Sequence, residues 1–185
     1  MNDSYYSCLT QEIEKTLDDN RIIPITEIIT PRVAHVVIAK LLAFEGRNQS
    51  RPIDIYLMTP GGDCDAGMSI IDAIQLCKCK VNIYAIGSVA SMGLPILVSA
   101  TGTKKCYPHA RFMYHEPSTE ASGKFTDVTI RAQELGVYKE AVAKLLIEKT
   151  KLTEKDIKDY GSRDIFFSAQ EALEKGFVDS IMDRR

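Results

Sequence analysis

Ser91 is the residue of this chain whose sequence surroundings best suit a nucleophile. It lies in the segment Gly-Ser-Val-Ala-Ser-Met-Gly at residues 87–93, between an apolar run at 81–86 that predicts a buried strand and a run at 94–100 that predicts a short helix. A serine at such a corner presents its hydroxyl to the positive end of a helix, where free backbone N–H groups can also hold an oxyanion. The same pattern is typical of an ordinary helix cap, so Ser91 alone does not establish catalysis.

A serine hydroxyl becomes reactive when a base takes its proton and a carboxylate holds that base in place. Among the three histidines, His115 is best placed because it ends an apolar strand and faces a polar loop, whereas His35 lies off the apolar stripe of a helix. Asp164 precedes the apolar run 165–167 and is a candidate buried carboxylate. Spacing alone does not select these residues, since a strand-end histidine is often structural and Asp164 beside Arg163 can be a plain ion pair.

A second strand-to-helix corner, Thr59-Pro60-Gly61-Gly62, follows a predicted strand at 53–58 and precedes a predicted helix at 66–77. Two glycines let the backbone turn so that neighbouring N–H groups point into one space. An ordinary connecting turn is the alternative.

The composition limits the classes of function. The 185 residues suffice for one domain with its own core, and 23 Lys and Arg against 25 Asp and Glu leave no basic stripe for nucleic acid. No apolar run approaches the roughly 20 residues that a membrane span needs, and the first residues do not resemble a signal peptide, so we expect a cytoplasmic protein. The cysteines are expected to be reduced thiols, and no metal site is expected because four of them lack a standard zinc spacing: Cys64, Cys77, Cys79 and Cys106.

Strands alternate with helices along the chain, which predicts an α/β architecture with a mainly parallel sheet. The predicted strands are 21–25, 53–58, 81–86, 104–107, 111–115 and 178–182, and the predicted helices are 10–17, 31–46, 66–77, 94–100, one beginning after Thr153 and one at 169–175. Pro24 lacks a backbone donor and therefore indicates that the first strand lies at an edge.

The longest predicted helix spans residues 125–150. Such a helix is about 39 Å long, which exceeds the width of a small domain, so we expect it to project and to pack against another subunit. Two helices separated near Gly136 are the alternative. Residues 1–20 are expected to form an N-terminal arm, followed by a single domain at 21–185.

Several motifs in order, with nearly the same spacings, resemble those of the proteolytic subunits of ATP-dependent Clp proteases. They cover about residues 20–182: 59–62 with 66–70, 87–93, 112–117, 123 with 126–127, 163–164, 168–172 and 176–179. The resemblance implies a crotonase-like fold, in which a mainly parallel sheet is flanked by helices and one handle helix projects. It also implies a self-compartmentalising serine endopeptidase that hydrolyses unfolded polypeptides.

The resemblance assigns a role to each candidate residue. It implies that Ser91 is the nucleophile, His115 the general base, Asp164 the orienting acid, Gly61 and Met92 the N–H donors of the oxyanion hole, and Arg163 a residue of the ring–ring contact. The handle is expected at about 117–150, and its first part, 117–124, is expected to bind substrate backbone as an added strand.

The resemblance also implies partners. We expect two stacked heptameric rings of this chain, fed by an AAA+ unfoldase that uses the ATP, with no cofactor in this subunit and no nucleic-acid or membrane partner. Four positions depart from the family pattern. Ser162 replaces an acid before Arg163, Glu116 replaces a glutamine beside the base, Met58 replaces an asparagine before the glycine turn, and Asp54 replaces an aromatic residue on the surface that receives the ATPase.

Two other functions are compatible with parts of the pattern. One is a regulatory or scaffolding ring subunit that is active only with a second subunit of the same type. The other is a crotonase-type acyl-CoA enzyme, which stabilises an enolate and needs no serine, so the presence of Ser91, His115 and Asp164 argues against it.

Overall fold

The strands of the structure, a computed structural model that describes residues 3–118, 122–161 and 163–183, form one sheet. The strands are β1 (Ile22–Ile25), β2 (Ile53–Thr59), β3 (Val81–Ala90), β4 (Lys104–Cys106), β5 (Arg111–Tyr114), β6 (Ile165–Phe167) and β7 (Ser180–Ile181). The helices are α1 (Asp3–Asp19), α2 (Pro31–Arg47), α3 (Cys64–Leu76), α4 (Gly93–Val98), α5 (Phe125–Lys149), α6 (Glu154–Tyr160) and α7 (Ala169–Lys175). Within the described residues the strand pairs are parallel except β5 with β6, so the predicted α/β class is confirmed.

The sheet branches at β3. Its main path runs β1-β2-β3-β4-β7, while β5 pairs with the far end of β3 and also with β6. Residues 83–85 of β3 pair with β4, and residues 88–90 pair with β5. The predicted strand at 81–86 was too short, because Gly87 adopts φ +59° and lets the strand change partner without ending.

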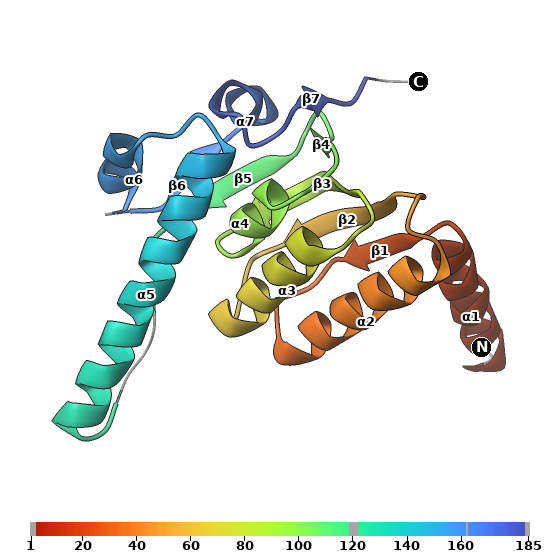
Figure 1. Cartoon of the computed structure of the whole chain (residues 1–185), viewed down its shortest axis with the longest axis horizontal. Coiled ribbons are helices and arrows are strands. Elements are labelled where there is room, and N and C mark those ends of the chain that lie inside the picture. Colours follow the sequence, from red (N-terminus) through yellow and green to blue (C-terminus); the bar gives the residue numbers. More distant parts are fainter. Residues whose placement is uncertain (1–2, 119–121, 162, 184–185) are drawn as a thin grey trace.

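Helices α2, α3 and α4 lie along one face of the sheet, and α5 extends away from it (Figure 1). The inward side chains of β2 and β3 are fully buried and alternate with less buried ones, as expected where one face of a sheet carries the core. Strand β1 lies at the edge of the sheet, as Pro24 predicted.

Helix α2 begins as predicted, since the Thr30 hydroxyl accepts a hydrogen bond from the Val33 N–H. The sequence predicted an end at Gly46, but the helix continues to Arg47. The Asn48 N–H then donates to the Phe44 carbonyl and caps the last turn.

Helix α5 is one continuous helix of 25 residues, about 37 Å long, so the alternative of a break near Gly136 is wrong. Its second half is held in the core by Val142, Leu145 and Leu146. Phe125 and Ile130 in its first half are exposed, and this half projects beyond the rest of the molecule (Figure 1). Among the helices that the structure describes, none is both long and apolar enough to cross a bilayer.

Arg21 is a buried residue directly before β1 that joins three segments. Its guanidinium donates to the carbonyl oxygens of Phe44, Arg51 and Pro52 at 2.7–3.1 Å and lies over the Phe44 ring. These carbonyls belong to the end of α2 and to the loop before β2, so one side chain ties β1 to both.

We expect Arg21→Met to lower the free energy of unfolding by about 3 kcal/mol, because it removes the donor from the buried Phe44 carbonyl and from the part-buried Arg51 and Pro52 carbonyls. Arg47→Met is the matched control: Arg47 also lies over the Phe44 ring but is exposed, so its loss is expected to cost less than about 1 kcal/mol. Urea unfolding at one protomer concentration measures both. Equal losses in the two variants would contradict the role given to Arg21.

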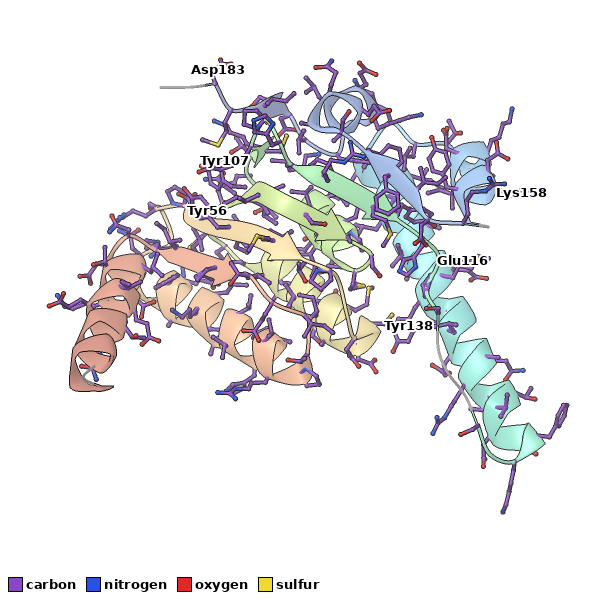
Figure 2. All side chains as sticks on the ribbon, turned by 180° about the vertical axis from the view of Figure 1, so that it is seen from behind. Tyr56, Tyr107, Glu116, Tyr138, Lys158 and Asp183 are labelled. Carbon is purple, nitrogen blue, oxygen red and sulfur yellow. The ribbon has the colours of Figure 1, made fainter. Side chains whose placement is uncertain are left out.

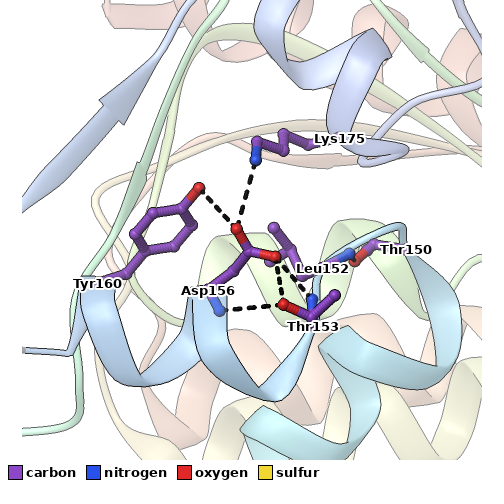
Figure 3. Close-up of polar contacts among 6 residues, drawn as sticks. All are labelled: Thr150, Leu152, Thr153, Asp156, Tyr160 and Lys175. Carbon is purple, nitrogen blue, oxygen red and sulfur yellow. Dashed lines mark hydrogen bonds and ion pairs between the residues drawn. The ribbon is translucent and has the colours of Figure 1, made fainter.

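Helix α6 carries the chain toward Asp164 and is capped by two reciprocal contacts (Figure 3). The Asp156 N–H donates to the Thr153 hydroxyl, while the Thr153 hydroxyl and N–H donate to the Asp156 carboxylate at 2.6 and 2.9 Å. Lys175 from α7 reaches the same carboxylate at 3.5 Å. Hydrogen bonds from the Thr153 hydroxyl and N–H, followed by the charge of Lys175, lower the pKa of Asp156 to about 2.

The lowered pKa makes the stability of α6 depend on pH. A carboxyl whose folded pKa lies below its ordinary 3.8 stabilises the fold above that value and loses this contribution as the pH falls toward about 2. We therefore expect Asp156→Asn to lower the thermal midpoint near neutrality, with a difference from wild type that shrinks below about pH 4. Asp159→Asn, on the exposed side of the same helix, is the control; a difference independent of pH would contradict this account.

Candidate active site

Ser91 lies directly after β3, at the tight corner that leads into α4. Its φ of +52° is in the left-handed region, which costs a residue with a β-carbon about 1–2 kcal/mol. The corner is held by the Ser91 N–H, which donates to the Met113 carbonyl at 2.9 Å, and by the Ser91 carbonyl, which accepts from the Leu94 N–H. Strained backbone of this kind persists where the surroundings hold it, and it concentrates at functional sites.

His115 follows the last residue of β5 and reaches Ser91 from the neighbouring strand. Because Ala90 of β3 pairs with Met113 of β5, the residues just beyond this pair approach one another at the end of the sheet. His115 Nε2 lies 2.7 Å from Ser91 Oγ. When the proton of the ring is on Nδ1, the serine hydroxyl donates to Nε2, which is the arrangement a general base requires.

Asp164 comes to the other nitrogen of the same ring. Tyr114 of β5 pairs with Ile165 of β6 in an antiparallel register, so the next residues, His115 and Asp164, lie opposite one another. Asp164 Oδ1 is 3.7 Å from His115 Nδ1, which is within ion-pair range but longer than a hydrogen bond. The side chain of Asp164 is 58 % exposed, so the expectation of a buried carboxylate was wrong.

The turn at Gly61 and Gly62 packs directly against the serine corner. A β-carbon added to Gly61 would lie 2.6 Å from Ser91 Cβ and 2.9 Å from the Met92 nitrogen, and Gly61 has φ +95°. Only glycine therefore permits this approach. The structure thus brings both residues expected at an oxyanion hole, Gly61 and Met92, to one side of Ser91.

The Gly61 N–H already has a partner within its own turn, since it donates to the Thr59 hydroxyl at 3.1 Å. The next residue is differently arranged. Ile29 bonds to the residues on either side of Gly62, donating to the Gly61 carbonyl and accepting from the Asp63 N–H. In a parallel ladder the N–H of the residue between these two points the opposite way, so the Gly62 N–H is directed away from Ile29 and has no partner in this ladder.

Cys64 is another potential nucleophile near this turn. Burial, and then the charges of Asp63 and Asp65, raise the pKa of its thiol, which keeps the thiol protonated and weakly nucleophilic near neutral pH. Within the described ranges, no three His, Cys, Asp or Glu residues are grouped so that they could hold a metal ion.

Two surface grooves lie along α5. One of about 380 Å³ separates α5 from the start of α3 and is lined in part by Gly62, Asp65 and Ser118, so it begins beside the glycine turn. The other, of about 670 Å³, lies between α5 and α6 and has Glu116 and Gly161 in its lining. Both grooves therefore border segments that carry the candidate residues.

The sequence did not predict two polar contacts that α5 makes with the site. The Tyr138 hydroxyl donates to the Asp65 carboxylate, and Lys139 forms an ion pair with Glu116, the residue after His115. Figure 2 shows Tyr138 pointing from α5 toward α3, with Glu116 beside α5. The partners are 73 and 23 residues apart in the chain, so no local pattern could have indicated them.

Two expectations are not tested by the single chain. The exposed Arg163 lies beside Asp164, and its role in a contact between rings stays a prediction. Of the segment expected to bind substrate backbone, 117–124, residues 119–121 lie outside the described residues.

Curated relatives resemble this chain over nearly its whole length. It is 36% identical over 185 residues to the ATP-dependent Clp protease proteolytic subunit 2 of Rhodococcus jostii (strain RHA1), an alignment that covers all of this chain and 91% of the relative. It is 35% identical over 177 residues to proteolytic subunit 1 of Mycobacterium bovis (strain ATCC BAA-935 / AF2122/97), covering 95% of this chain and 88% of the relative.

The family profile gives the same result as these relatives. The profile described as Clp protease matches residues 7–185, which include the serine corner, the glycine turn and all of α5. The chain belongs to the Clp protease family.

Proposed function

We propose that Ser91, His115 and Asp164 are the catalytic triad of a serine endopeptidase subunit. His115 Nε2 accepts the hydroxyl proton as Ser91 Oγ attacks the carbonyl carbon of a peptide bond. The imidazolium then gives this proton to the leaving amine, and the acyl group stays on Ser91. Water next attacks the acyl carbon and gives a proton to His115, which returns it to Ser91 as the carboxylic acid leaves.

The observation that carries this proposal is the 2.7 Å contact between Ser91 Oγ and His115 Nε2, made by a serine with φ +52°. In this conformation of the corner, Ser91 Oγ lies within hydrogen-bond distance of the base. An ordinary helix cap does not need this conformation, because a capping serine has extended backbone.

The developing oxyanion needs donors that are not already used. We propose the Met92 N–H, at the start of α4, as one donor. The second donor is the Gly62 N–H rather than the Gly61 N–H expected from the sequence, because the latter donates to Thr59. The fit of Gly61 against Ser91 then brings this turn within reach of the oxyanion.

The substrates of this site are proposed to be unfolded polypeptides. The groove of about 380 Å³ borders Gly62 and Ser118, so an extended chain can run past Ser91 and along the segment 117–124. Strand addition satisfies the backbone of the substrate and requires little of its side chains.

The proposed assembly consists of stacked rings joined through α5. Large apolar side chains are exposed along its projecting part: Phe125, Ile130 and Val137. Exposed apolar groups on a helix that leaves its own domain are stabilised by a partner surface, and a second copy supplies the same surface. Two heptameric rings, with Arg163 near their contact, are the finer form of this proposal.

A separate surface is proposed to receive an AAA+ unfoldase, which would use the ATP and act in the cytoplasm. Leu42 and Leu76, toward the ends of the adjacent helices α2 and α3, are exposed. Tyr56 and Tyr84 stack with ring centroids 5.0 Å apart on β2 and β3, and Tyr56 lies on the sheet face seen in Figure 2. Asp54, which replaces a family aromatic residue, accepts a hydrogen bond from Asn82, so its charge has a local partner.

One observation favours a second function, that of a ring subunit active only with another Clp-type subunit. The 3.7 Å separation between His115 Nδ1 and Asp164 Oδ1 is too long for the hydrogen bond that fixes the base. A partner ring that brings Asp164 closer would complete the triad.

Ser91→Ala is expected to abolish labelling by a fluorophosphonate probe, because the probe reacts with an activated serine hydroxyl. Ser88→Ala, which removes an exposed hydroxyl three residues earlier in β3, is expected to label like the wild type. Intact-mass spectrometry of the labelled proteins measures both. Equal labelling of wild type and Ser91→Ala would exclude Ser91 as the nucleophile, whereas labelling of Ser91 that needs an added Clp-type subunit would support the second function.

The two proposed surfaces can be separated by a pair of matched substitutions. Val137→Glu places a charge in the apolar part of α5 and is expected to halve the assembly mass measured by light scattering, while Leu76→Glu leaves that mass unchanged. Leu76→Glu is expected to abolish stimulation by an added unfoldase. A lower assembly mass for Leu76→Glu, or a loss of stimulation with unchanged mass for Val137→Glu, would contradict the assignment of that surface.

A further inference from the structure

Two consecutive residues of α5 contact two different parts of the candidate site. Tyr138 donates its hydroxyl to Asp65, and Lys139 pairs with Glu116. Neighbouring residues of a helix point about 100° apart, so one turn of α5 can reach two segments that are themselves separated. We call these two contacts the α5 clamp.

The contact of the clamp between Lys139 and Glu116 reaches the residue next to the base. Glu116 follows His115 and lies outside β5, so the register of the sheet does not hold its side chain. Its carboxylate pairs with Lys139 on α5 and also lies near Gly161, where a β-carbon would be 3.6 Å from Oε2. Gly161 is the cap of α6, three residues before Asp164. Glu116 therefore lies among the segment of the base, the segment of the acid and α5.

The contact between Tyr138 and Asp65 reaches the helix that follows the glycine turn. Asp65 is in the first turn of α3, two residues after Asp63, which caps the helix by accepting from the Ala66 N–H. The Asp65 hydrogen bond raises the pKa of Tyr138 to about 12, so the phenol remains a donor at any physiological pH. Tyr138 thus holds α5 to the element that continues from Gly61 and Gly62.

We propose that Glu116 and Lys139, supported by Asp65 and Tyr138, position His115 and the glycine turn relative to Ser91. This inference rests on the proposed function. The 3.7 Å contact of His115 with Asp164 is longer than a hydrogen bond, and Glu116 is joined directly to His115 along the chain, so holding Glu116 also restrains the base. A displacement of α5 would then move the base and the oxyanion turn together.

The expected size of the effect is modest. The Lys139 and Glu116 side chains are 54 % and 39 % exposed, and pairs with such exposure shift an equilibrium by no more than about fivefold. The fold of α5 is supported elsewhere by the buried Val142, Leu145 and Leu146, so the loss of the clamp is expected to show in the rate of the chemical step rather than in the stability of the fold.

The test compares Lys139→Met with Lys144→Met. Lys144 is a matched control because it lies on the same helix and its ion pair is with Glu148, four residues away on α5 itself, rather than with Glu116. We expect Lys139→Met to lower kcat for a fluorogenic peptide by about fivefold, with KM and the thermal midpoint little changed. Lys144→Met is expected to match the wild type in all three quantities. Tyr138→Phe, which removes only the hydroxyl, is expected to change kcat in the same direction as Lys139→Met.

A charge exchange distinguishes positioning from loss of structure. The double variant Glu116→Lys with Lys139→Glu restores an ion pair of reversed direction and should recover most of the lost kcat, whereas each single change should not. Equal kcat for Lys139→Met and Lys144→Met, or a double variant no better than its two single changes, would overturn the inference. Labelling that survives Ser91→Ala would instead contradict the proposed function, so the two failures are distinct.

Discussion

The pairing of β5 with two neighbours is the constraint on which the candidate site depends. Its parallel register with β3 matches Ala90 with Met113, and its antiparallel register with β6 matches Tyr114 with Ile165. Each register places one candidate residue beside His115, so a shift by one residue on either side would separate the group and turn buried side chains outward. The buried Phe112, Phe167 and Phe177 pack edge to face or tilted against one another under these strands and oppose such a shift.

Close backbone contact around Ser91 explains why the corner keeps an unfavourable conformation. The left-handed φ of Ser91 costs about 1–2 kcal/mol, and the turn at Gly61 leaves no space for a side chain. Gly93 behind the corner is equally close to Thr59, where a β-carbon would lie 2.7 Å from the threonine methyl group. Two strand ends and a helix start are thus packed backbone against backbone, and the serine hydroxyl is the group that this packing leaves available to the base.

The sequence predicted the order of the elements and the mainly parallel sheet, because strand and helix periods and capping residues are local signals. The capping box at Ser168 and Glu171 is one example that the structure confirms. It could not predict that β3 continues through Gly87, since this depends on a change of pairing partner from β4 to β5. Nor could it predict the exposure of Asp164, which depends on how the folded segments surround that residue. The family resemblance, rather than spacing, selected the three candidate residues.

Helix α5 connects the proposed assembly surface with the segments that hold the triad. Its second half packs into the domain core, while its first half carries exposed apolar side chains. Near the middle of the helix, Tyr138 and Lys139 connect it to α3 and to Glu116. Polar contacts of this exposure are weak, so the position of the first half depends on whatever surface covers Phe125 and Ile130. The segment after His115 contacts the same part of α5, and the 3.7 Å separation from Asp164 leaves room for the base to move. The geometry of the base therefore depends on the surroundings of the projecting helix as well as on the contacts within a single chain.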